Sequence, residues 1–131
     1  MKKCQSICSP SLIAIVLSAA GCSSTNSGPA TIQGLPKGEF NRVFLAAVSV
    51  GAAEHCGDPV DGPLVRSNLL GFQTKNGLDS ALVSQSANQY DSILAEYKSR
   101  IAADTDFCTT EYTPDPDRLR GYENSLFPEV T

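Results

Sequence analysis

Residues 79–108, DSALVSQSANQYDSILAEYKSRIAADTDFC, carry the longest periodic pattern of the chain. Apolar residues and tyrosines recur there at steps of three, four and seven, which is the spacing of one face of an α-helix. This face consists of Val83, Ala87, Tyr90, Leu94, Tyr97, Ile101 and Cys108. The opposite face carries the charged residues Asp91, Glu96, Lys98 and Arg100. A freestanding coiled coil is the alternative, but about four heptads in a chain this short favour the core of a helical bundle.

Two shorter helices are predicted before this one. Apolar residues recur at spacings of three and four from Glu39 to Cys56, and Gly57 is a suitable helix C-cap. The expected buried stripe of this helix is Phe40, Val43, Phe44, Ala47, Val48 and Gly51. The next helix starts at Asp61-Gly62-Pro63, with a capping residue and a proline in the first turn, and ends at Asn76-Gly77. Its expected stripe is Leu64, Val65, Asn68, Leu69 and Phe72.

A fourth, short helix is predicted after the third. Thr113-Pro114-Asp115-Pro116 breaks the helical pattern, because a residue before proline is disfavoured in the α region. The residues that then recur at helical spacing are Leu119, Tyr122, Leu126 and Phe127. Pro128 is expected to end this helix.

Two cysteines indicate how the helices are joined. Cys56 and Cys108 lie 52 residues apart, at the ends of the first and third helices, which an up-down-up arrangement places on the same side. We therefore predict a disulfide, whose loop-closure entropy stabilises the fold by at most about 4 kcal/mol. Unbroken, the third helix spans about 43 Å against about 20 Å for the second, so we expect a bend near residues 103–106 or a tilted second helix. The predicted fold class is all-α: a small bundle of three to four helices with one disulfide.

The first residues predict an export signal. Lys2 and Lys3 precede an uncharged apolar run from Ser11 to Ala20. About ten such residues span roughly 15 Å, half of a bilayer's hydrocarbon core, so the run is typical of a secretory signal peptide.

The end of this signal resembles the bacterial lipobox. In that motif small residues precede a cysteine that is fatty-acylated and becomes the new N-terminus, and Ala19-Ala20-Gly21-Cys22 fits it, although Ala19 stands where leucine is most frequent. The resemblance implies a lipid anchor on Cys22, and Ser23 implies sorting to the outer membrane, facing the periplasm. The alternative is an ordinary signal peptide cut after Ala19 or Ala20.

Three segments follow from these boundaries: a signal peptide at 1–21, a lipidated cysteine with a flexible tether at 22–38, and a helical domain at 39–131. The tether is predicted from its Ser, Thr, Gly and Pro content. Loss of Lys2 and Lys3 with the leader leaves 8 basic and 14 acidic side chains. Such an acidic protein would be repelled by anionic headgroups and does not suit a nucleic-acid partner, so membrane contact is expected through acyl chains alone.

Metal-binding and redox chemistry are not indicated by the remaining polar residues. Asp104, Asp106 and Glu111 have some calcium-loop spacing but lack the turn glycine and the ligand order of an EF-hand. A reactive or zinc-binding thiol is the alternative to the disulfide, but one histidine and no CxxC pair argue against zinc. No metal and no cofactor are expected.

Enzymatic activity is not expected either. His55 with Glu54 and Asp58 has the composition of a general base, but a lone histidine at a helix C-terminus is usually a dipole-compensating residue. No nucleophile elbow or phosphate loop accompanies it. Tyr90, Tyr97 and Tyr112 are expected in the core and at its boundary.

Residues 45–127 resemble the pilotins of type II secretion systems. The features that carry the resemblance are Gly51-Ala52-Ala53 leading to His55-Cys56, a glycine after the second helix, Tyr90 to Leu94 with Tyr97, and Cys108. The resemblance implies a binding or assembly module that holds a segment of a protein partner in a groove between helices, with no binding residue assigned. A periplasmic inhibitor or surface-exclusion lipoprotein, or a structural subunit of an envelope complex, are the alternatives.

Overall fold

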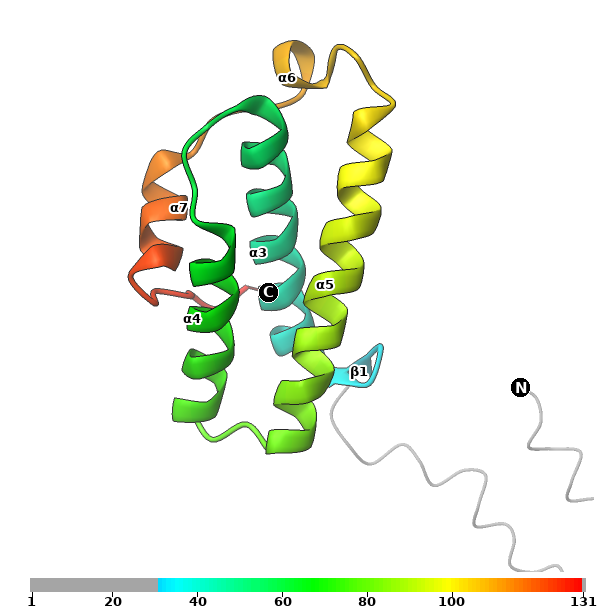
Figure 1. Ribbon diagram of the computed structural model, residues 1–131. Coiled ribbons are helices and arrows are strands. Elements are labelled where there is room, and N and C mark those ends of the chain that lie inside the picture. The colour runs from blue at the N-terminus through cyan, green and yellow to red at the C-terminus, as the bar shows by residue number, and fades with distance from the viewer. Residues whose placement is uncertain (1–30, 131) are drawn as a thin grey trace, which may run out of the picture. The chain divides into compact units, whose positions relative to one another are not determined.

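A computed structural model describes residues 31–130, in which three long helices stand side by side and two short ones follow (Figure 1). The elements along the chain are β1 (Thr31–Ile32), β2 (Leu35–Pro36), α3 (Lys37–Cys56), α4 (Gly62–Lys75), α5 (Ser80–Ala102), α6 (Phe107–Thr110) and α7 (Pro116–Glu123). The predicted all-α bundle with one disulfide is confirmed. The predicted signal peptide 1–21 and the acylation site Cys22 lie outside the described residues.

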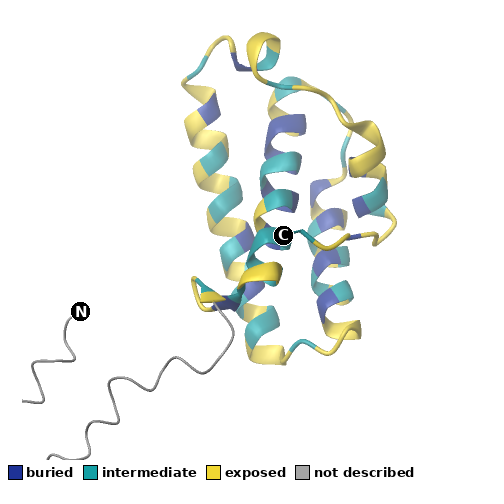
Figure 2. Ribbon diagram, turned by 180° about the vertical axis from the view of Figure 1, so that it is seen from behind, coloured by how far each residue is buried: buried dark blue, intermediate teal, exposed yellow. Residues whose placement is uncertain are grey.

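Helix α3 is the centre of the bundle, and every other element of the described part contacts it. Figure 2 shows it between α5 on one side and α4 with α7 on the other. Its buried residues are mostly small: Val43, Ala46, Ala47, Val50, Gly51, Ala52 and Ala53. A Cβ placed on Gly51 would lie 3.2 Å from side-chain atoms of Leu94 and Tyr97. The backbones of α3 and α5 therefore approach closely because glycine stands at this point.

The predicted helix ends are confirmed where a cap residue marks them. Gly57 adopts a left-handed conformation with φ 84°, and the N–H groups of Gly57 and Asp58 donate to the carbonyls of Glu54 and Ala53. This is the hydrogen-bond pattern that closes a helix at a glycine. At the start of α4, the Asp61 carboxylate accepts from the backbone N–H of Leu64 at 3.0 Å.

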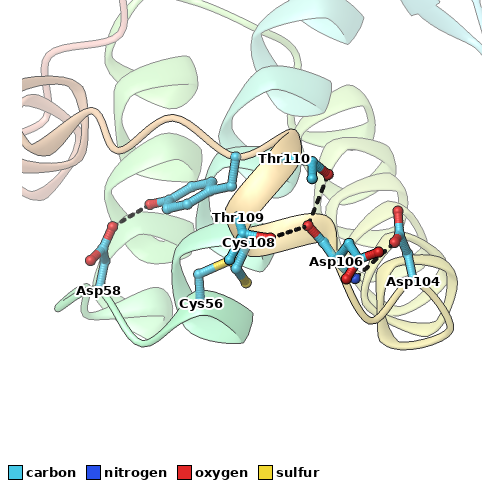
Figure 3. The surroundings of a disulfide bond; sticks show 8 residues. Cys56, Asp58, Asp104, Asp106, Cys108, Thr109 and Thr110 are labelled. Carbon is cyan, nitrogen blue, oxygen red and sulfur yellow. Dashed lines mark hydrogen bonds between the residues drawn. A yellow bond between two sulfur atoms is a disulfide. The ribbon is translucent and has the colours of Figure 1, made fainter.

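The third helix is interrupted at the expected place. α5 ends at Ala102, residues 103–106 form a turn, and Cys108 lies on the separate helix α6. The disulfide between Cys56 and Cys108 is formed, with 5.5 Å between the two Cα atoms (Figure 3). The break shortens the rise of α5 so that the chain can turn back over the end of α3.

The flexible tether was predicted to extend too far along the chain. Residues 31–36 form a short antiparallel hairpin, and α3 begins at Lys37 rather than at Glu39. Gln33 and Gly34 both have positive φ, 54° and 84°, which closes the two-residue turn and lets Leu35 become fully buried. The Ser, Thr and Gly content suggested a linker, whereas the buried side chain of Leu35 and a hydrogen bond from Gln85 to the carbonyl of Gln33 hold this segment against the bundle.

The fourth helix is shorter than predicted. α7 ends at Glu123, and Ser125 adopts φ 63° while the N–H groups of Ser125 and Leu126 donate to the carbonyls of Tyr122 and Gly121. This is again the closing pattern of a left-handed cap, here at a serine, so the sequence offered no glycine to mark it. Phe127 lies beyond the helix and stacks on Tyr122 with 5.0 Å between ring centroids.

The close approach at Gly51 yields a stability prediction with a matched control. Gly51→Leu is expected to lower the free energy of unfolding by about 1–3 kcal/mol, because the side chain must enter a packed helix contact. Gly71→Leu, on the exposed side of α4 with no atom within 4 Å of a new Cβ, is expected to leave stability unchanged or raise it by up to about 1 kcal/mol. Urea unfolding of both variants checks this, and equal effects would contradict the close contact.

Candidate functional site

Two hollows open on the Cys56 half of the bundle, and both have a wall in the segment that joins α5 to α7. We call this segment, residues 103–115, the connecting segment. The smaller hollow, the rear groove, has a volume of about 180 Å³, and the larger one, the proline cleft, about 720 Å³. Leu119 of α7 lines both.

The connecting segment is attached to α3 and to the loop after it at three points. The disulfide is the first, and the Tyr112 hydroxyl, which donates to Asp58 at 2.5 Å, is the second (Figure 3). The third is Phe107, a buried ring with His55, Tyr97 and Tyr112 at centroid distances of 6.2, 6.2 and 6.3 Å. Together these contacts fix the position of the wall that the two hollows share.

The rear groove runs along one face of α3. Leu45, Val48, Ser49 and Ala52 line it from α3. Phe44, which shares a face with Val48 and Ala52 at four-residue spacing, is 46% exposed. The rest of the lining is mixed in polarity and consists of Tyr97, Tyr112, Thr113, Asp115, Arg118 and Leu119. The groove therefore presents an apolar helix face with an exposed aromatic ring at one end.

Two expected core residues are thus exposed. Phe44 was predicted on the buried stripe of the first helix and Leu64, which is 40% exposed, on that of the second. The prediction was wrong at Phe44 because the side of α3 that packs against α5 uses small residues such as Ala47 and Gly51. The larger apolar side chains Phe44 and Leu45 lie on a different face of α3. Hydrophobic periodicity does not show which of the two faces packs against another helix.

The proline cleft lies between the α3–α4 loop and α7. The prolines of its lining are Pro59, Pro63, Pro114 and Pro116. Its charged residues are Glu54, Asp58, Asp61, Arg120 and Glu123. Glu123 accepts from the backbone N–H of Asp61 at 2.7 Å, which ties α7 to the start of α4. Sequence reasoning did not find this cleft, although prolines before α4 and α7 were recognised as helix signals.

The residues considered for acid–base chemistry are engaged elsewhere. Glu54 pairs with Lys98 of α5 at 2.9 Å, and Asp58 accepts from Tyr112. His55 is exposed and lies edge-on to Phe107. The three side chains therefore contribute an ion pair, a hydrogen bond and a ring contact to the packing of this end of the bundle.

The acidic stretch after α5 forms a local turn. The Asp104 carboxylate accepts from the backbone N–H of Asp106 at 3.1 Å. In residues 31–130, no three His, Cys, Asp or Glu side chains gather in a way that would hold a metal ion. Over the same residues, no helix combines the length and apolar character that a membrane crossing requires.

All four tyrosines have a raised pKa, chiefly because burial disfavours the charged phenolate. Tyr90 is nearly fully buried, and the described residues offer its hydroxyl no hydrogen-bond partner. Burial, followed by the hydrogen bond to Asp58, raises the pKa of Tyr112 to about 12. Tyr97 and Tyr112 are half-buried, so the expected core and boundary positions of these tyrosines are confirmed.

Comparisons of the chain with protein-family models, with curated proteins and with solved structures find no match. The fold and its hollows therefore define the class: a small helical bundle, closed by one disulfide, with an apolar groove and an acidic, proline-lined cleft.

The tyrosines predict an alkaline limit of stability. Above pH 10, the usual tyrosine pKa, the unfolded chain loses phenolic protons that the folded chain retains, so the free energy of unfolding falls as the pH rises toward 12. We expect tyrosinate absorbance to rise together with the loss of helical circular dichroism. Tyr112→Phe removes one titrating group and should weaken the pH dependence. Tyrosines that all titrate near pH 10 in a protein that stays helical would contradict the burial described above.

Proposed function

We propose that this protein is a lipoprotein of the bacterial cell envelope, anchored through acylated Cys22 in the outer membrane and facing the periplasm. Its helical bundle acts as a binding or assembly module for a protein partner of the envelope. A pilotin-like chaperone of a secretion component is the form of this activity that the sequence resemblance favours.

The rear groove is the observation that carries the proposal. Its α3 face, from Phe44 to Ala52, extends over about 12 Å, which corresponds to roughly two turns of a helix. Leu45 and Val48 are only half-buried there, and Phe44 is exposed next to them. Such a face suits an amphipathic partner helix with apolar residues at steps of three and four. The occupant proposed here is a short amphipathic helix of an envelope protein.

The alternative classes remain an inhibitor or surface-exclusion lipoprotein and a structural subunit of an envelope complex. A structural subunit is expected to gather its exposed apolar residues on one fixed contact surface. The exposed large apolar residues of the described part come instead from three elements, with Phe44 on α3, Leu64 on α4 and Leu126 after α7. This distribution favours a local groove over a broad apolar contact.

Acylation of Cys22 is tested by intact mass and fractionation. The wild-type protein is expected to lack residues 1–21, to carry fatty acyl groups and to remain with membranes, whereas Cys22→Ala should lose all three properties. Ser23→Ala is the matched control and should still be acylated. A new N-terminus at Ala20 or Gly21 would instead show an ordinary signal peptide and remove the anchor from the proposal.

The rear groove is tested by site-specific photocrosslinking in intact cells. A photoreactive residue at Phe44 or Val48 is expected to capture the same envelope protein, and one at Leu64, an exposed apolar position on α4, is not. Phe44→Glu should weaken binding of the captured segment at least about tenfold, since burial of a Phe side chain contributes about 1.5–3 kcal/mol. Equal capture at positions 44 and 64, or no effect of Phe44→Glu, would reject the groove as the binding site.

A further inference from the structure

The proline cleft is the larger of the two hollows described above, and its volume of about 720 Å³ falls within the range of ligand pockets, about 300–1,000 Å³. Four prolines restrict the backbone of its walls. Pro59 and Pro63 flank the start of α4, and Pro114 and Pro116 flank the start of α7. Because each proline ring fixes φ, little conformational entropy remains to be lost when a ligand is bound.

The cleft carries an excess of negative charge. Glu54, Asp58, Asp61 and Glu123 line it, against the single cation Arg120, whose guanidinium contacts Asp117 at 2.9 Å. Lys98 neutralises Glu54. Among residues 31–130, no Lys, Arg or His nitrogen lies within 4.0 Å of the carboxylates of Asp58, Asp61 or Glu123. A ligand that supplies a cation therefore complements the cleft.

The lining also limits the shape of that cation. The carboxylates of the described residues do not converge as a metal site would require. Between them lie proline rings together with Val60 and Leu119, which offer apolar surface. Lysine and arginine side chains match this mixture, because their long apolar stems pack on such surfaces while the charged head reaches a carboxylate.

We propose that the proline cleft binds a peptide segment of a protein partner through a lysine or arginine side chain flanked by apolar residues. The apolar stem lies along the proline rings, and the charged head lies among Asp58, Asp61 and Glu123. The cleft shares Leu119 with the rear groove, but Asp58, Asp61 and Glu123 do not line that groove, so this proposal is tested separately from the proposed function.

The test is an NMR titration of the oxidised, folded protein with the blocked tetrapeptide Leu-Arg-Leu-Pro. We expect saturable shifts of the amides of Val60, Asp61 and Glu123, which line the proline cleft and not the rear groove, and a loss of affinity of at least about tenfold when citrulline replaces the arginine. Citrulline keeps the shape of the side chain and removes its charge. Equal affinity of the two peptides, or no saturable shift in the cleft, would overturn the proposal.

Variants of the chain give the reciprocal test. The double variant Asp58→Asn with Glu123→Gln removes two charges but keeps oxygens that accept the hydrogen bonds from Tyr112 and Asp61. It is expected to lower the affinity for the peptide at least about tenfold. Asp91→Asn removes a carboxylate that pairs with Arg66 outside the cleft and is expected to leave affinity unchanged. Similar losses in both proteins would show nonspecific attraction and overturn the site.

Two further measurements complete the test. If the double variant unfolds, Val60→Lys is used in its place, because a lysine in the cleft wall should compete with the peptide and abolish the peptide-induced amide shifts. Spermidine, a flexible polyamine without a peptide backbone, is titrated in parallel. Tighter binding of spermidine than of the peptide would overturn the peptide assignment, while photocrosslinking at Phe44 would stay unaffected by any outcome at the cleft.

Discussion

The covalent bond between Cys56 and Cys108 is the constraint on which the arrangement of both hollows depends. It holds α6 against the end of α3, and the connecting segment, residues 103–115, then runs on to α7. Tyr112 lies shortly after α6. Its side chain lines the rear groove, and its hydroxyl donates to Asp58, which lines the proline cleft. Without the bond, this wall would rest on the Phe107 ring cluster and one hydrogen bond alone. The disulfide therefore shapes the surface as well as stabilising the fold.

The packing of α3 explains why an apolar face remains open. A central helix that contacts all its neighbours needs small residues where backbones approach, and Ala47 and Gly51 provide them. The larger residues Leu45 and Val48 line the rear groove instead, where they are only half-buried. Close packing on one side and an accessible apolar groove on another thus arise from the same distribution of side-chain sizes.

The sequence predicted those features that local chemistry decides. Among them are the Gly57 cap, the Asp61 cap, the disulfide and the break after Ala102. Each of these features is signalled by the identity of one or a few residues. The left-handed backbone conformation of Ser125 was not predicted, because that conformation is normally marked by a glycine. The proline cleft escaped prediction for a different reason. Its two halves come from segments far apart in the sequence, and they are brought together by tertiary contacts, among them the disulfide and the hydrogen bonds of Asp58 and Asp61 with Tyr112 and Glu123.

The position of the hairpin relates the proposed anchor to the hollows. The described chain enters the bundle at Thr31, beside the start of α3 (Figure 1). Cys56 is at the other end of that helix, about 30 Å away, and Glu54 and Asp58 beside it line the cleft. Leu35 is buried at the entry, and Gln85 of α5 donates to the carbonyl of Gln33 at 3.0 Å. A pull from an upstream lipid anchor would therefore act on the hairpin rather than on the first turn of α3. The proline cleft would be shielded from that load because the entry of the chain and the cleft lie at opposite ends of α3.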